Sequence, residues 1–194
     1  MTHRPPDLPS GGTADSGAPD AVVPDTKDWT WTLAERCPDC GFDARTVTAA
    51  DIATRITAYT DPWPGVLARP DAAARPSPAT WSPLEYACHV RDVCRLFEER
   101  VRLMLTQDAP TFANWDQDET ALAQRYGEQE PSVVARELAE AAAGLAGAYA
   151  AVPDDAWRRT GRRSDGSEFT VLTLGQYGLH DLAHHLWDVG IPVP

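Results

Sequence analysis

Residues 179–189 read LHDLAHHLWDV and hold three of the five histidines of the chain. His180 and His184 are four positions apart, so on a helix their side chains lie on the same face, with Cβ atoms ~5–6 Å apart. At about 100° per residue, the apolar face of this helix has His180 at its border and His184 just beyond it. This arrangement suits two ligands of one metal ion, placed where the core meets solvent.

Two other interpretations of this stretch remain open. A histidine pair at this spacing also occurs on protein surfaces, or in cores where ordinary hydrogen bonds satisfy the rings. Asp181 and His185 form a second pair four residues apart, which faces further from the core on the same helix. We favour His180 and His184 as the ligand pair.

The strongest helix signal elsewhere in the chain covers residues 82–105. Ser82 and Glu85 form a capping box, and Pro83 stands at the first helical position. His89 lies close to the centre of the apolar stripe of this helix. Besides the final cluster, it is the one histidine outside the extreme N-terminus, so we expect it to be the third ligand. A neutral core histidine bonded to a carbonyl or carboxylate is the alternative.

The remaining pattern predicts an all-α fold, namely a four-helix bundle with long connections. A first helix begins near Asp51 and is interrupted at Pro62, and another runs from Pro131 to about residue 152. Thr173 and Gln176 resemble a second capping box, which would start the final helix. The acidic stretch 108–130 reads as a connection with a short helix near 119–125. Residues 158–169 form a long loop or a short hairpin, and we expect no sheet.

Length and charge limit the classes of function. The 194 residues suit one domain, which we place at 28–194, after a Pro- and Gly-rich tail at 1–27 that we expect to be disordered. The formal net charge of −12 argues against a nucleic-acid partner. No apolar run is long enough for a membrane span or a signal peptide, so we expect a cytoplasmic protein without a membrane partner.

Cys37 and Cys40 form a CxxC motif within the segment 28–47. No second CxxC or CxxH follows at the spacing of a zinc ribbon or finger, and the βαβ context of a thioredoxin-like pair is missing. Three interpretations stay open: a turn that packs against the bundle, a redox pair, or part of a metal site. Cys88 and Cys94 read as packing residues.

The order and spacing of the segments WSPLEYACHV and HDLAHHLWD resemble the DinB/YfiT-like superfamily of four-helix metalloproteins, over roughly residues 51–190. The CPDCGFD opening is similar to that of actinobacterial members. The resemblance implies a divalent metal site at His89, His180 and His184. The superfamily includes mycothiol-dependent maleylpyruvate isomerase and bacillithiol transferases. In the isomerase, the first ligand of the last-helix pair is a glutamate, whereas here we assign His180.

We therefore expect a metal-dependent enzyme that transfers a low-molecular-weight, mycothiol-like thiol onto an electrophilic small molecule. A metal held by three imidazoles keeps positions open and lowers the pKa of a bound thiol or water. Zinc is the first expectation, with nickel or iron as alternatives. Asp181 and Asp188 are expected to orient ligands, and Tyr177 and Trp187 to line the pocket. No catalytic residue is assigned. A metal-dependent hydrolase and a non-catalytic binding bundle remain alternatives, and a homodimer remains open.

Overall fold

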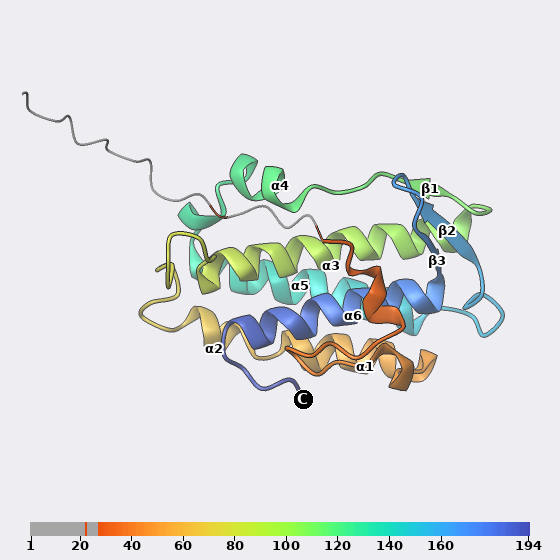
Figure 1. Ribbon diagram of the computed structural model, residues 1–194, viewed down its shortest axis with the longest axis horizontal. Coiled ribbons are helices and arrows are strands. Elements are labelled where there is room, and N and C mark those ends of the chain that lie inside the picture. The colour runs from red at the N-terminus through yellow and green to blue at the C-terminus, as the bar shows by residue number, and fades with distance from the viewer. Residues whose placement is uncertain (1–21, 23–26) are drawn as a thin grey trace, which may run out of the picture.

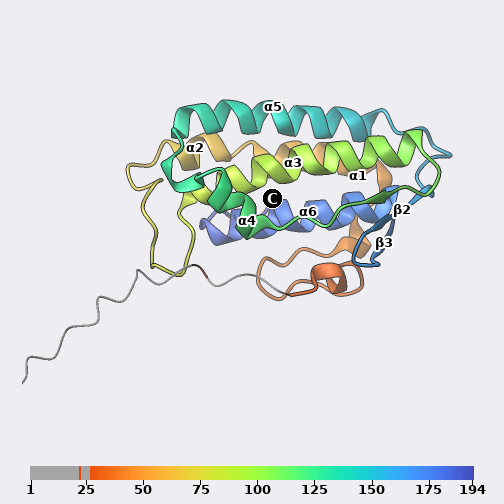
Figure 2. The same ribbon diagram turned by 90° about the horizontal axis from the view of Figure 1, so that it is seen from above.

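The computed structural model describes residue 22 and residues 27–194. The expected tail at 1–27 therefore lies outside the described residues, except for Val22 and Lys27. Four long helices run side by side as a bundle (Figures 1 and 2), which confirms the predicted fold class. They are α1 (Ala49–Thr60), α3 (Pro83–Thr106), α5 (Pro131–Ala150) and α6 (Val171–Asp188).

Within the described residues, five short helical elements lie in the segment before α1 and in the connections between the long helices. The chain kinks after α1 at Pro62 and continues as a short helix, as its prolines predicted, and a second short helix lies in the acidic connection. They are η1 (Trp29–Leu33), η2 (Ala44–Thr46), α2 (Trp63–Leu67), α4 (Gln117–Ala123) and η3 (Tyr126–Glu128). Among the helices described, none is long and apolar enough to cross a membrane.

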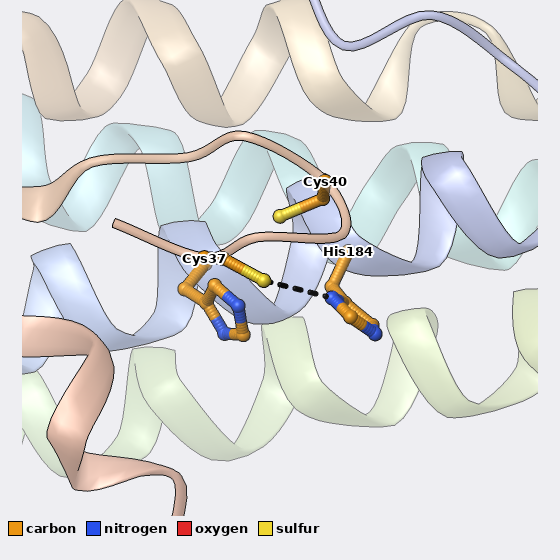
Figure 3. A group of neighbouring side chains, drawn as sticks. Cys37, Cys40 and His184 are labelled. Carbon is orange, nitrogen blue, oxygen red and sulfur yellow. Dashed lines mark hydrogen bonds between the residues drawn. The ribbon is translucent and has the colours of Figure 1, made fainter. Parts of the chain in front are cut away.

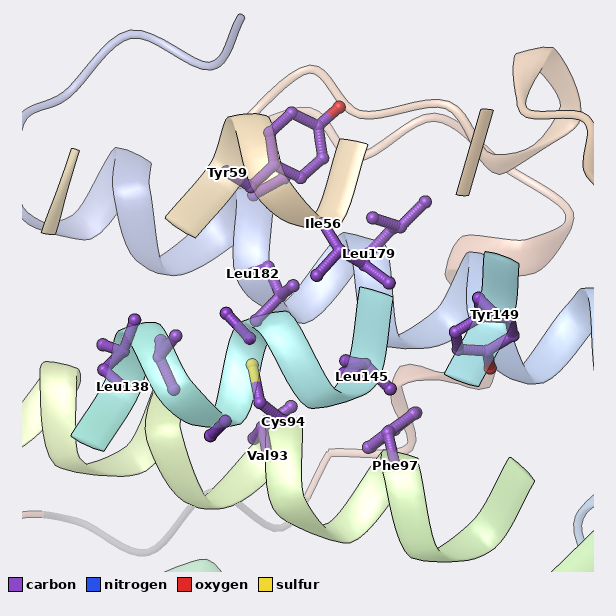
Figure 4. Packing of buried hydrophobic residues seen from close by; sticks show 14 of the residues in the cluster. Ile56, Tyr59, Val93, Cys94, Phe97, Leu138, Leu145, Tyr149, Leu179 and Leu182 are labelled. Atoms are coloured by element: carbon purple, nitrogen blue, oxygen red, sulfur yellow. The ribbon is translucent and has the colours of Figure 1, made fainter. Parts of the chain in front are cut away.

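The core fills the space between the four long helices. Figure 4 shows Ile56 of α1, Val93 of α3, Leu138 of α5 and Leu182 of α6 pointing into this shared interior, and all four are buried. Full burial of such a side chain contributes about 1.5–3 kcal/mol. Packing therefore holds α3 and α6 in fixed relative positions, which the candidate site needs.

The beginning of α3 follows the sequence prediction. Ser82 Oγ accepts a hydrogen bond from the Glu85 amide at 3.2 Å, and Glu85 Oε2 accepts one from the Ser82 amide at 2.8 Å. These two bonds satisfy amides that have no partner within the helix. Because the cap fixes where α3 starts, it also fixes the face on which His89 lies, about two turns further on.

The predicted start of α6 is wrong by a few residues. Thr170 is the N-cap residue, and its Oγ1 accepts a hydrogen bond from the Thr173 amide at 3.1 Å. Thr173 completes this capping box in the place where glutamate or glutamine is usual. Gln176 has a different role: its Nε2 donates to the Ala44 and Val47 carbonyls at 3.0 and 2.8 Å. Gln176 thereby attaches the N-terminal segment to α6.

The expectation of no sheet is also wrong. β2 (Thr160–Arg163) and β3 (Glu168–Thr170) form an antiparallel hairpin, one of the two alternatives for this stretch, and β1 (Thr111–Phe112) pairs parallel with β2. The two residues of β1 are too few for any period to appear in the sequence. The small sheet covers the end of the bundle where α6 begins (Figure 1), with Phe112 and Phe169 buried beneath it.

Candidate metal centre

α6 carries two ligand pairs on neighbouring faces, and each pair joins a different group. One ligand atom each from His89, Asp181 and His185 lies within 4.8 Å of the other two. His180 and His184 group instead with Cys37 and Cys40, again with all ligand atoms within 4.8 Å of one another. The structure therefore does not bring His89 together with His180 and His184, the three ligands expected from the sequence.

The observed grouping differs from the expected one because of the direction in which α3 packs against α6. Neighbouring residues on a helix point about 100° apart, so the pairs 180/184 and 181/185 face different partners. The face with Asp181 and His185 meets His89 of α3, whereas the other face meets the segment 28–47. Helical phase on α6 alone cannot decide which pair α3 contacts.

His89 is fully buried among aromatic rings. It stacks on Trp115 with ring centroids 5.3 Å apart, lies 5.5 Å from the Trp81 ring, and meets the ring of His185 edge-on at 4.7 Å. Within the part of the chain that the structure describes, neither of its ring nitrogens has a hydrogen-bond partner. A buried imidazole without hydrogen bonds is costly, and a metal ion that accepts its lone pair removes this cost.

Asp181 and His185 complete the group. Asp181 Oδ1 lies 3.4 Å from His89 Nε2 and 3.6 Å from His185 Nε2. On its other side, His185 Nδ1 lies 2.7 Å from Asp188 Oδ2. A carboxylate accepts hydrogen bonds, so Nδ1 carries the proton and the Nε2 lone pair points into the group. Asp188 therefore orients a ring as expected, but that ring is His185, and Asp181 lies among the ligand atoms themselves.

The charges in this group suit a cation. Burial lowers the pKa of His89, which keeps its imidazole neutral. Burial alone would raise the pKa of Asp181, but the neighbouring His89 and His185 outweigh it and lower that pKa to about 2. Neutral imidazole and ionised carboxylate are the protonation states that bind metals. These residues therefore fit a divalent ion such as zinc, held by two nitrogens and one oxygen.

His180 and His184 lie on the side of α6 that faces the N-terminal segment. The His180 ring lies 5.5 Å from the Trp29 ring and 5.9 Å from the Phe42 ring, and burial, followed by the charge of His184, lowers its pKa to about 4. Both cysteines are free thiols. Burial raises the pKa of Cys40 to about 12, which argues against a reactive thiolate there in the metal-free protein.

A cavity of about 320 Å³ opens beside both groups. Tyr177 lines it as expected, but Trp187 does not: its side chain is 47% exposed and packs on the His184 ring. Among the described residues, those that line it include three aspartates and no lysine or arginine. They are Val22, Trp29, Ala79, Thr80, Trp81, Tyr86, Gln117, Asp118, Tyr177, His180, Asp181, His184, His185 and Asp188.

Sequence reasoning missed the aromatic side chains that surround the site. Trp81 ends the Pro-rich connection before α3, and Trp115 lies in the acidic connection before α4. Neither belongs to a helix whose periodicity would indicate a direction. A tryptophan in an otherwise polar connection was the available signal, because such a large apolar side chain is seldom left in solvent.

Comparison with known proteins bears on the family and the fold. The sequence profile of the DinB superfamily matches residues 65–189. Among solved structures, the chain is similar to YfiT from Bacillus subtilis, described as "a probable metal-dependent hydrolase with an unusual four-helix bundle topology". The TM-score is 0.61 at 17% sequence identity, over 73% of this chain and 86% of that chain. No curated protein sequence matches. The structural likeness supports the fold.

Proposed function

The chain belongs to the DinB superfamily, and from this premise and the geometry of the site we propose that it is a metal-dependent enzyme centred on His89, Asp181 and His185. The observation that carries the proposal is the convergence of these three ligand atoms beside the cavity, which Asp181 and His185 line, with both nitrogens of His89 without a hydrogen-bond partner among the described residues. His180 and His184, the earlier candidates, are not part of this centre.

The reaction we propose first is transfer of a low-molecular-weight, mycothiol-like thiol onto an electrophilic small molecule. Asp181 supports this choice. With Asp181 and His185 as the last-helix pair, the first ligand is a carboxylate, of the same chemical class as the glutamate of the maleylpyruvate isomerase to which the family resemblance points. With His180 as the first ligand, the chain differed from the isomerase at this position; with Asp181 as the first ligand, both have a carboxylate there.

A bound divalent ion would lower the pKa of a thiol or water placed beside it and so supply a nucleophile near neutral pH. The residues of the chain prepare the site for this chemistry. Asp188 holds the His185 ring in one orientation through its 2.7 Å contact. Trp81 and Trp115 cover His89 and keep bulk water from it. Both effects keep the ligands in place before a substrate arrives.

The cavity also restricts the substrate. Aspartates line it, and no lysine or arginine does so within the described chain. A substrate with two carboxylates would therefore lack a partner for at least one of them. Trp29, Trp81 and Tyr86 offer apolar ring faces instead. We propose a neutral or cationic electrophile with an apolar part, and a thiol that is itself neutral.

Hydrolysis is the second candidate. The fold match to YfiT, described as a probable metal-dependent hydrolase, favours it. The same three ligands would serve either reaction, because a water and a thiol compete for the same open position. The two candidates differ in whether a thiol is consumed.

The test uses untagged full-length protein loaded with zinc, nickel or iron. Thiol consumption is followed with neutral thiols and neutral electrophiles, and ester or amide hydrolysis is followed without thiol. We expect metal-dependent thiol transfer that falls roughly 100-fold or more in Asp181→Asn, since loss of groups supporting a metal already costs ~10–100-fold. Asp154→Asn, an exposed carboxylate in a turn, is the matched control. Metal-dependent hydrolysis without thiol consumption would favour the second candidate. Failure of the wild type to bind metal would overturn both.

A further inference from the structure

The CxxC segment lies directly against α6, on the face that the proposed centre does not use. Figure 3 shows Cys37, Cys40 and His184 with their side chains directed toward one another. We propose that Cys37, Cys40, His180 and His184 form a second metal site, a closed zinc site with a structural role. It is independent of the function proposed above.

The distances suit a single tetrahedral ion. Cys37 Sγ lies 3.6 Å from His184 Nδ1 (Figure 3). With Zn–S of ~2.3 Å and Zn–N of ~2.0–2.1 Å, tetrahedral geometry separates a sulfur and a nitrogen ligand by roughly 3.6 Å. A thiol–imidazole hydrogen bond would also explain this one contact. It would not explain why one atom from each of four ligand-type side chains lies within 4.8 Å of all the others.

The backbone holds the two cysteines in a tight turn. The Gly41 amide donates to the Cys37 carbonyl at 3.0 Å, and the Cys37 amide donates to the Phe42 carbonyl at 2.9 Å. Gly41 has a φ of +77°, a conformation that other residues adopt only with strain. This turn brings both sulfurs to the side that faces α6, where a helix supplies the second pair of ligands four residues apart.

Burial gives a second, independent indication of a ligand. His180 is 4% exposed, and its Nε2 lacks a hydrogen-bond partner within the described residues. Cys37 is fully buried beside it. Two sulfurs and two imidazoles select zinc over harder cations such as magnesium or calcium. Four protein ligands also leave no position open for substrate, which distinguishes this site from the centre at His89.

The position of the site indicates what it stabilises. Trp29 of η1 packs on the rings of both His180 and His184, and it also lines the cavity. Gln176 of α6 also binds this segment, through the Ala44 and Val47 carbonyls. A zinc ion that joins Cys37 and Cys40 to α6 would therefore hold one wall of the substrate cavity in place.

Cobalt substitution gives a direct test. Co²⁺ bound by thiolates has an intense sulfur-to-cobalt charge-transfer band in the near ultraviolet, whereas the centre at His89 has no sulfur ligand. Metal-free, reduced, full-length protein is titrated with Co²⁺ and then with Zn²⁺. We expect this band, together with the visible absorption of tetrahedral cobalt, and its loss when zinc displaces the cobalt. Absence of the charge-transfer band in the wild type would overturn the proposal, whatever the variants do.

Variants assign the ligands. Cys37→Ser and His184→Ala should lose the band and bind zinc at this site roughly 100-fold or more weakly, beyond the ~10–100-fold cost of losing supporting groups. Cys88→Ser, which removes a buried thiol of α3, should keep the band, and so should Asp181→Asn. A Cys37–Cys40 disulfide in protein purified without oxygen and with zinc present would contradict the proposal. Loss of the band in Asp181→Asn alone would also contradict the proposed zinc site at Cys37 and Cys40. That result would leave the proposed centre at His89, Asp181 and His185 in place.

Discussion

His89 Nε2 and Asp181 Oδ1 lie 3.4 Å apart, in the interior, on two helices that are far apart in the sequence, α3 and α6. His89 is fully buried, and its ring is enclosed by Trp81 and Trp115. The pair has the separation of two ligands around one cation and no hydrogen bond between them. Removing the carboxylate charge at this position is therefore the most direct perturbation of the proposed centre.

Asp181→Asn should lower metal binding at this centre by roughly 100-fold or more while the chain stays folded, since an amide keeps the shape of the side chain but not its charge. The metal content of the purified protein and a zinc competition titration measure the effect. Cys37→Ser is the comparison, because it alters the other group and should leave metal at His89, Asp181 and His185. Equal zinc affinity in the wild type and in Asp181→Asn would exclude Asp181 as a ligand.

Much of the bundle could be predicted from sequence because its signals are local. Ser82, Pro83 and Glu85 determine the start of α3 through contacts within four residues, and the apolar stripes show which face of each long helix is buried. The start of α6 was misplaced because Thr173 serves at the third position of the capping box, where glutamate or glutamine is the usual signal.

The arrangement of ligands could be predicted only in part. The sequence singled out His89, His180 and His184 as ligands and left a metal site open for Cys37 and Cys40, but it preferred the pair His180/His184 over Asp181/His185. The structure groups His89 with Asp181 and His185 instead. Whether α3 contacts the 180/184 face or the 181/185 face depends on how the whole bundle packs, and a rotation of about 100° exchanges the two. Periodicity within one helix contains no information about that rotation.

The capping pair of α3 should make stability depend on pH. Burial would raise the pKa of Glu85, but hydrogen bonds from Arg75 and Ser82 outweigh it and hold that pKa below its ordinary value of 4.5. A folded-state pKa below the unfolded value stabilises the protein above the unfolded pKa, and this stabilisation is lost as the pH falls through the folded pKa. Glu85→Gln should therefore cost about 1–3 kcal/mol near neutral pH, with the difference shrinking below pH ~4.

Urea unfolding of the wild type and Glu85→Gln, followed by circular dichroism across this pH range, measures the difference. Glu140→Gln is the control, because Glu140 pairs with Arg136 on the exposed surface of α5, where ion pairs contribute about 0–1 kcal/mol. A Glu85→Gln difference that stays constant from neutral to acid pH would show that the carboxylate charge is not what stabilises the cap.

Two buried tyrosines should respond in opposite ways to loss of the hydroxyl. Tyr149 Oη has no hydrogen-bond partner within the described chain, whereas Tyr126 Oη donates to Asp92 Oδ2 at 2.6 Å. Tyr149→Phe should leave stability unchanged or raise it by up to about 1 kcal/mol, because it removes an unsatisfied polar group. Tyr126→Phe should cost about 1–3 kcal/mol, because it leaves a buried carboxylate short of a donor. Thermal and urea unfolding test both, and a larger loss in Tyr149→Phe than in Tyr126→Phe would contradict the assignment.

Two helical glycines provide a test of how closely α6 packs on its neighbours. A Cβ at Gly175 of α6 would lie 2.6 Å from Ile52 Cδ1 and 3.0 Å from Tyr149 Cε1, whereas a Cβ at Gly147 of α5 would meet no atom within 4 Å. Gly175→Ala should therefore cost about 1–3 kcal/mol through overpacking, and the flexible end of Ile52 favours the lower part of that range. Gly147→Ala should stabilise the protein by up to about 1 kcal/mol, since alanine favours a helix over glycine. Urea unfolding of the two variants measures both effects, and stabilisation by Gly175→Ala would mean that α1 and α6 lie further apart than the structure has them.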